Sequence, residues 1–316
     1  MLAPIVIFAF NRPEALQKLL DSLGMNSFYE ESDKYIFIDG PRCEEDKAKV
    51  DEVITIARKV ASNISISPVN RGLGNSIIAG VSTIIAEYGK AIVLEDDLIC
   101  APNFLSYMNQ ALDFYENDNK IISICGYGLK IKRPRGYVGD VYLLGRSSSW
   151  GWATWKDRWE QIDWDIQDWN EFSSNKQMRR AFNKNGSDMY SMLKGYMEGK
   201  NHSWAIRFCY NQFKLGKYSI CPFISKVDNI GFGEEATNCK QRYSRFKINF
   251  QDIGYQLIST PPTHGAIHTM QSQNDKLYRF NFPLQIECNR SIYKQNIKYH
   301  SISIRIYSKI RNILRI

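Results

Sequence analysis

The stretch "AIVLEDDLICAPNF", residues 91–104, places three consecutive acidic residues directly after an apolar run. An apolar run followed by a polar break and Pro102 is typical of a buried strand that leads into a helix. At the end of such a strand, Glu95, Asp96 and Asp97 would repel one another and resist desolvation. The stretch therefore predicts either a site that binds a cation or an ordinary solvated turn.

Strand and helix patterns alternate along the first 128 residues, with this stretch as the fourth strand. The predicted strands are 4–10, 34–40, 63–69, 90–97 and 121–128. The predicted helices are 13–23, 44–60, 74–89 and 103–117. Such alternation with short connections indicates right-handed crossovers and parallel pairing. The predicted fold class is therefore α/β, with a mostly parallel, Rossmann-like sheet flanked by helices.

Polar residues gather at the predicted carboxyl ends of these strands, where ligands bind in sheets of this kind. Arg12 and Arg71 are candidates to neutralise a diphosphate, for which guanidinium is suited; the alternative for either is an ordinary surface arginine. Asp39 could accept hydrogen bonds from a ribose or a base; the alternative is a turn Asp before glycine. The chain has no GxGxxG after the first strand and no GxxxxGK[ST], which disfavours a dinucleotide fold and a P-loop NTPase.

The acidic triplet suits Mg²⁺ or Mn²⁺, which take oxygen ligands. Mg²⁺ is often held by only one or two carboxylates, with phosphates and water completing its shell. Asp97, at the end of the predicted strand, is expected to point to the rim of the sheet. Glu95 and Asp96 alternate sides, so one of them could meet a sugar and the other a basic side chain or the backbone.

The composition changes in the second half of the chain, where the segment "SSSWGWATWKDRW" at 147–159 is rich in tryptophan. Trp152, Trp155 and Trp159 fall at helical spacing, so one interpretation is a helix that packs its aromatic side chains into the core. Trp150 and Gly151 are better placed to stack on a sugar, because an aromatic face offers a flat apolar partner to the pyranose ring.

The net charge of +8 belongs to the end of the chain, since 289–316 carries basic residues and no acidic one. This asymmetry argues against a nucleic-acid surface on the body. The segment 301–316 predicts a basic amphipathic helix on an anionic membrane surface; a helix docked on the domain and an edge strand are the alternatives. The seven scattered cysteines show no CxxC pair, which fits a reducing compartment.

Five motifs, in this order, resemble bacterial sugar transferases of the GT-A fold and the catalytic domain of N-acetylglucosaminyltransferase I. They are "FAFNRPEAL", "YIFIDGPR", "NRGLGNSIIAGV", "IVLEDDLICAPNFLSYM" and "SSSWGWATWKDRW". In that family the acidic triplet stands in for the DxD motif, which binds a nucleotide-sugar through Mn²⁺. The resemblance covers roughly residues 3–240. The expected organisation is a nucleotide-sugar-binding half at 1–128, an acceptor half at 129–288 of the same domain, and the basic tail at 289–316.

The resemblance also implies roles for individual residues. Asp97 would be the direct ligand of Mn²⁺ or Mg²⁺. The expected donor-binding residues are Arg12, Asp39, Arg71, Glu95, Asp96, Trp150 and Gly151. Relatives often carry Asp where this chain has His202, and "GEDATH" where it has "GEEATN" at 233–238. An inverting transferase needs a general base, and the candidates are His202, Glu234 and Glu235.

The expected function is a metal-dependent glycosyltransferase. It would move a sugar from a nucleotide-sugar, expected to be UDP-linked, to a glycan hydroxyl in bacterial surface polysaccharide synthesis, with inversion by analogy. A lipid-linked acceptor would suit a cytoplasmic protein attached to the inner face of the cell membrane through its tail. The rivals are a sugar-phosphate nucleotidyltransferase, which usually has a Gly-rich basic loop after its first strand, and a catalytically inactive glycan-binding module.

Overall fold

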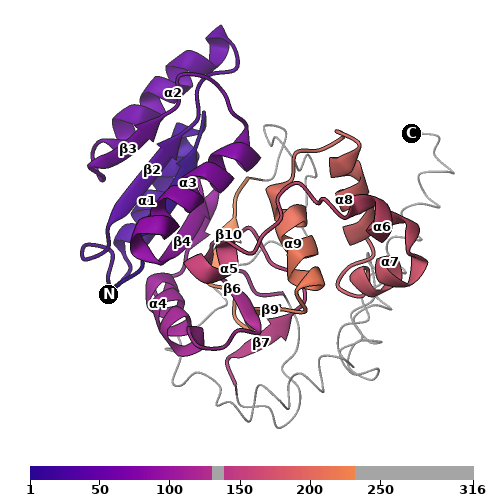
Figure 1. Cartoon of the computed structure of the whole chain (residues 1–316). Helices are drawn as coiled ribbons and strands as arrows, with labels where there is room; N and C mark the ends of the chain where they lie inside the picture. The colour runs from indigo at the N-terminus through magenta and orange to yellow at the C-terminus, as the bar shows by residue number, and fades with distance from the viewer. Residues whose placement is uncertain (130–138, 232–316) are drawn as a thin grey trace, which may run out of the picture.

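An eight-stranded sheet runs through the computed structural model, which describes residues 1–129 and 139–231 (Figure 1). Its strands are β1 (Ile5–Ala9), β2 (Lys34–Ile38), β3 (Asn63–Ile66), β4 (Lys90–Glu95), β6 (Ile121–Cys125), β7 (Val141–Leu144), β8 (Trp152–Trp155) and β9 (Tyr218–Pro222). They lie in the order β3-β2-β1-β4-β8-β6-β9-β7. Only β7 and β8 run antiparallel to their neighbours in this sheet. A separate antiparallel ladder joins β5 (Leu98–Cys100) to β10 (Val227–Asn229).

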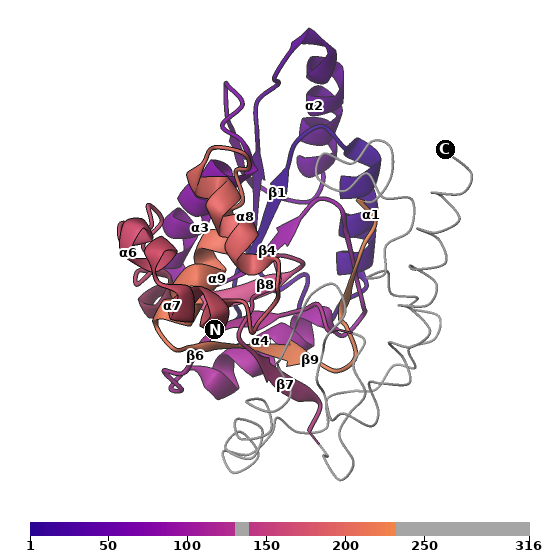
Figure 2. The same cartoon turned by 90° about the vertical axis from the view of Figure 1, so that its right-hand side faces the viewer.

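Helices cover both faces of the sheet (Figure 2). The helices of the described residues are α1 (Pro13–Gly24), α2 (Glu44–Ala57), α3 (Leu73–Tyr88), α4 (Phe104–Tyr115), α5 (Lys156–Trp159), α6 (Trp169–Ser174), α7 (Lys176–Phe182), α8 (Met189–Met197) and α9 (Trp204–Lys214). Of these, α6, α7 and α8 pack with α9 in a separate third core. The core on one face takes buried residues from α1, α2 and α4, and the core on the other face takes them from α3, α5 and α9. The predicted α/β class, with a mostly parallel sheet flanked by helices, is confirmed.

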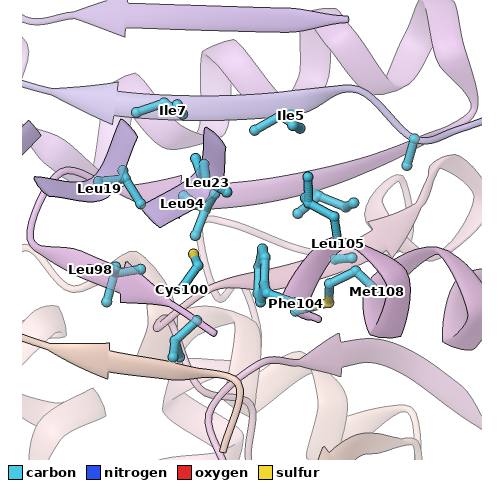
Figure 3. Packing of buried hydrophobic residues seen from close by; sticks show 14 of the residues in the cluster. Ile5, Ile7, Leu19, Leu23, Leu94, Leu98, Cys100, Phe104, Leu105 and Met108 are labelled. Atoms are coloured by element: carbon cyan, nitrogen blue, oxygen red, sulfur yellow. The ribbon is translucent and has the colours of Figure 1, made fainter. Parts of the chain in front are cut away.

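Strand β1 shows why its apolar run is continuous. Ile5 and Ile7 pack into one core, while Val6 and Phe8 pack into the other, because successive side chains of a strand point to opposite faces. In Figure 3, Ile5 and Ile7 lie in the same packed layer as Leu94 of β4 and side chains of α1 and α4. A strand that is covered on both faces needs apolar residues at every position.

The helical interpretation of the tryptophan-rich segment is wrong for residues 152–155, although Trp152, Trp155 and Trp159 are buried in the core as it expected. Trp152–Trp155 form strand β8, which lies between β4 and β6 and pairs antiparallel with both. Trp152 and Trp155 therefore belong to opposite cores, as the alternation of a strand requires. Trp159 follows on α5 and stacks on Trp152 with ring centroids 5.7 Å apart. Two neighbouring strands satisfy the backbone of this segment, so pairing outweighs the helical spacing of its tryptophans.

No helix within residues 1–129 and 139–231 has the length and apolar character needed to cross a membrane. The predicted amphipathic helix at 301–316 lies outside the described residues. Its attachment to an anionic membrane surface remains a prediction.

Candidate active site

The loops that follow β2, β1 and β4 meet at the carboxyl edge of the sheet, because these three strands are neighbours and parallel. Asp39 follows β2, Arg12 lies in the loop after β1, and Asp96 and Asp97 follow β4. The backbone continues this adjacency past the strands, since Asp39 N donates to Ala9 O at 3.0 Å and Asp96 N donates to Phe8 O at 3.0 Å. Three of the predicted strand ends thus form one rim.

Asp96 and Asp97 form a turn between β4 and β5 and are not part of a strand, which corrects the predicted strand end at residue 97. The regular pairing of β4 with β1 stops at Glu95, opposite Phe8. Beyond this point Phe10 N donates to the side-chain Oδ2 of Asp96 at 3.1 Å. A side chain therefore takes the place of a backbone partner, which frees the chain to turn.

Arg12 bridges the two carboxylates of this turn. Its Nη2 lies 2.5 Å from Asp96 Oδ1, and its Nη1 donates to Asp97 Oδ2 at 2.8 Å. The Asp96 contact is an ion pair without hydrogen-bond geometry, since that oxygen is buried and has no hydrogen-bond partner among the described residues. Two predicted donor-binding residues and the predicted metal ligand are thus in direct contact, although 85 positions separate Arg12 from Asp97.

The electrostatics of the turn follow from its burial. Burial raises the pKa of Asp96 to about 6, although Arg12 acts in the opposite direction. Burial, together with Asp97 and Asp96, also raises the pKa of Glu95 well above its usual value. For Arg12, burial opposes the charged form, but the two aspartates outweigh it and hold the pKa of the guanidinium above its usual value. The turn thus strongly favours a cation beside it.

The β5–β10 ladder brings a second layer of residues to Asp97 that the sequence did not reveal. Asn229 Nδ2 donates to Asp97 Oδ1 at 3.3 Å, and Ile230 N donates to Asp97 O at 2.8 Å. Gly231 lies so close that a Cβ on it would overlap Asp97 Oδ2. "VDNIG" carries no periodic signal, and 132 positions separate Asn229 from Asp97, so only the fold reveals this contact.

Replacing Gly231 by Ala is expected to displace the Asp97 carboxylate, because the added methyl group would overlap Asp97 Oδ2. We expect Mn²⁺ affinity, measured by calorimetry, to fall by about tenfold to a hundredfold, as when a partner that orients a metal ligand is lost. Gly24→Ala is the matched control, since a Cβ there meets no atom within 4 Å. Equal Mn²⁺ affinity in the two variants would contradict this packing role.

Asp39 holds the loop after β3 against the end of β2. Its Oδ1 accepts from Arg71 N at 2.8 Å, and its Oδ2 accepts from Gly72 N at 2.9 Å. A buried carboxylate that accepts backbone N–H groups fixes a loop strongly. The Arg71 side chain is exposed, so the backbone of this residue is anchored while its guanidinium faces solvent. Binding of a ribose or a base by Asp39 remains a prediction, since carboxylate oxygens retain further acceptor capacity.

A second buried carboxylate, Asp46, ties the loop after β1 to the loop after β2. Its Oδ1 accepts from Asn11 Nδ2 at 2.6 Å, and its Oδ2 accepts from Arg42 Nε at 3.0 Å. Hydrogen bonds from Arg42, the largest influence, hold the pKa of Asp46 well below its usual value. The sequence indicates only an acidic first turn of α2 here. The contact positions Asn11, the neighbour of Arg12.

Trp150 and Gly151 lie beside the same edge. Gly151 has φ of 56° and packs against Val227 and Leu94, the residue before Glu95 in β4. The half-buried Trp150 ring meets Tyr127 edge-on, with centroids 4.6 Å apart. Stacking of a sugar on Trp150 remains a prediction, and this placement brings it to the end of β4.

His202 is exposed and lies in the loop before α9. Its backbone carbonyl packs against the first turn of α3, where a Cβ on Gly74 would lie 2.9 Å from His202 O. The helix α3 starts just after Gly72, so the loop with His202 borders the Asp39 side of the rim. The other candidate bases, Glu234 and Glu235, lie outside the described residues.

The acidic turn fits a hard divalent cation in the chemistry of its donors. Asp96 and Asp97 offer carboxylate oxygens, and the Arg12 guanidinium already acts as a cation against both. No group of three or more His, Cys, Asp or Glu side chains suited to a metal occurs in the part of the chain that the structure describes. A cation at this turn would therefore need substrate phosphates and water for the rest of its shell, as Mg²⁺ commonly does.

This fold and edge define an α/β protein with a cation-favouring turn beside polar loops. No protein-family model matches the chain. It is similar to alpha-1,3-mannosyl-glycoprotein 2-beta-N-acetylglucosaminyltransferase from Arabidopsis thaliana, with 26% identity over 132 residues. The match covers 35% of this chain and 29% of the plant protein, so the chain spans less than a third of that relative's length. The relative belongs to the class of transferases that the motifs resemble.

Three solved structures show a partly similar arrangement. S. aureus TarS has a TM-score of 0.43 at 12% identity, covering 73% of this chain and 61% of its own. GalNAc-T7 with UDP, GalNAc and Mn²⁺ has a TM-score of 0.49 at 11% identity, covering 81% and 46%. The mannosyltransferase PcManGT from Pyrobaculum calidifontis, with GDP-Man and Mn²⁺, has a TM-score of 0.37 at 11% identity, covering 68% and 70%. These scores are low, so the likenesses identify no activity for this chain.

Proposed function

We propose that the chain is a metal-dependent glycosyltransferase of the GT-A type that uses a nucleotide-sugar as donor. The observation that carries the proposal is the acidic turn at the carboxyl edge of the sheet, where Asp96 and Asp97 face Arg12. This is the edge at which ligands of parallel α/β sheets bind. The sequence similarity to part of an N-acetylglucosaminyltransferase supports the same class of reaction.

The proposed roles follow from the chemistry of each side chain. Asp97 would hold Mn²⁺ or Mg²⁺, which supplies charge stabilisation for the leaving diphosphate. Arg12 would pair with the diphosphate, because a guanidinium matches phosphate oxygens. Asp39 would accept hydrogen bonds from the nucleoside. Arg71 would lie at the mouth of that pocket, since its side chain faces solvent.

The sugar would lie between the turn and Trp150, whose ring can cover an apolar sugar face. Glu95 and Asp96 would face the donor, and Gly151 would form the floor beneath it. A base would then take the proton of the acceptor hydroxyl. His202 is the described candidate, because a neutral imidazole can accept a proton; Glu234 and Glu235 are the others. Inversion at the sugar is proposed from the resemblance alone.

The acceptor and the setting are part of the same proposal. A UDP-linked donor, a glycan hydroxyl as acceptor and a role in bacterial surface polysaccharide synthesis are consistent with the motifs. The basic segment 289–316 would hold the protein on an anionic membrane, where juxtamembrane basic residues attract acidic lipids. That attachment would bring the site to a lipid-linked acceptor at the cytoplasmic face.

A thermal-shift screen of nucleotide-sugars with and without Mn²⁺ tests this function. The donor should stabilise the folded chain by about 2.7 kcal/mol when present at about 100 times its Kd. We expect the shift to need both the nucleotide-sugar and Mn²⁺, and to be absent with the free sugar. If no nucleotide-sugar shifts the melting temperature or releases nucleotide, while a free glycan does stabilise the protein, the chain is a glycan-binding module and not a transferase.

A further inference from the structure

The Arg12 guanidinium lies against Asp96 and Asp97, where a cation bound by the acidic turn would also lie. All four carboxylate oxygens of the turn already have a partner. Those of Asp96 face Phe10 N and Arg12 Nη2, and those of Asp97 face Asn229 Nδ2 and Arg12 Nη1. Asp96 and Asp97 are nearly inaccessible, with 2% and 8% of their surface exposed, so solvent screens these contacts little.

A divalent cation bound at Asp97 Oδ2 would compete with the guanidinium for this oxygen. Arg12 Nη1 lies 2.8 Å from this oxygen. A bound Mg²⁺ would lie closer still, at about 2.0 to 2.1 Å. The two cations would then lie within a few ångströms of each other, where like charges repel strongly in a poorly screened site. Binding of the metal therefore favours departure of Arg12 from Asp97.

Arg12 has room to leave. Its side chain is 32% exposed, in contrast to the carboxylates that it bridges. The residue lies at the N-terminal cap position of α1, and its side chain makes no capping hydrogen bond there. Rotation of the side chain would therefore break the two ion pairs and leave the helix intact. Its backbone remains held, because Leu16 N donates to Arg12 O at 3.0 Å.

We propose that Arg12 is a built-in counter-ion that the metal displaces, and that the released guanidinium pairs with the donor diphosphate. This inference rests on the proposed function. It gives Arg12 a second role, because the guanidinium keeps metal affinity low until a diphosphate arrives to accept it. Metal and nucleoside diphosphate therefore bind cooperatively, and each raises the affinity for the other by the same factor.

Calorimetric titration of the full chain with Mn²⁺, alone and with saturating UDP, tests this inference. Wild type should bind Mn²⁺ weakly alone and about tenfold more tightly with UDP, a typical coupling between two sites. Arg12→Gln removes the competing charge, so its affinity for Mn²⁺ alone should rise by about tenfold or more. UDP should then raise Mn²⁺ affinity less in this variant than in wild type, and the gain that remains is the part due to the phosphate oxygens as metal ligands.

Two further variants test whether displacement of Arg12, and not a general change in charge, explains the gain in Mn²⁺ affinity. Arg146→Gln removes the same charge from the loop after β7, where Arg146 pairs with Asp188 at 2.7 Å, and should leave Mn²⁺ affinity unchanged. Arg12→Lys keeps the charge but cannot bridge two carboxylates in the manner of a planar guanidinium. It should give an intermediate Mn²⁺ affinity, and it provides a folded comparison if the glutamine variant is unstable, as melting curves would show.

The outcomes are distinct. Equal Mn²⁺ affinity in wild type, Arg12→Gln and Arg12→Lys would contradict the displacement of Arg12 by the metal. The proposal of metal-dependent sugar transfer would still stand. An equal gain in Arg146→Gln would also overturn the displacement, because general electrostatics would then account for the effect. If Mn²⁺ binds none of these proteins even with UDP, both the displacement and the metal-dependent function fail.

Discussion

Asp97→Asn is expected to reduce Mn²⁺-dependent release of nucleotide from a nucleotide-sugar by at least about a hundredfold, because a metal contributes several kcal/mol of charge stabilisation in such reactions. The amide is close in shape to the carboxylate but carries no charge, so it is a poor ligand for a hard cation. Initial rates with saturating Mn²⁺ and donor, compared between variant and wild type, give the measurement.

Asp113→Asn is the matched control for this experiment. Asp113 also pairs with a basic side chain, Lys90, at 2.7 Å, but it is 66% exposed and lies on α4, away from the turn. The same chemical change there should leave the rate unchanged, since exposed ion pairs contribute little. A wild-type rate in Asp97→Asn would show that this carboxylate does not hold the metal, even if the protein is a transferase.

Trp152→Ala is expected to lower the free energy of unfolding by about 3 to 5 kcal/mol, the cost of removing a large aromatic side chain from a core. Trp152 is 2% exposed and lies on β8 in the middle of the sheet. Its ring centroid is 4.8 Å from that of Trp204 and 5.8 Å from that of Phe208, so the substitution leaves a cavity that aromatic neighbours line. Urea denaturation followed by circular dichroism measures the change.

Trp152→Phe distinguishes a cavity from the loss of the indole itself. Trp152 Nε1 is buried and has no hydrogen-bond partner among the described residues, so replacing indole by phenyl breaks no such bond there. We expect this variant to lose well under half of the stability that Trp152→Ala loses, because it leaves the smaller void. Comparable losses in the two variants would show that Trp152 stabilises the fold through its indole group itself and not through the volume that it fills in the core.

The sheet and its helices could be predicted because their signals are local. The apolar runs at 4–10 and 34–40 indicate strands, and the amphipathic segment at 13–23 indicates a helix. Short connections between such elements then require crossovers. The helical interpretation of Trp152–Trp155 failed for the opposite reason. A strand inserted between β4 and β6 obtains its hydrogen bonds from distant residues, and spacing within the segment does not reveal such partners.

The site shows the same division. Local pattern was sufficient to bring Arg12, Asp39 and the acidic triplet to one rim, since parallel strands must end together. The three-dimensional arrangement was needed to show that Arg12 bridges Asp96 and Asp97. It was also needed for Asn229 and Gly231, which reach Asp97 through a ladder between strands far apart in the chain. The type of each element follows from short-range periodicity, whereas strand order and the partner of a charged side chain depend on which segments the completed fold brings together.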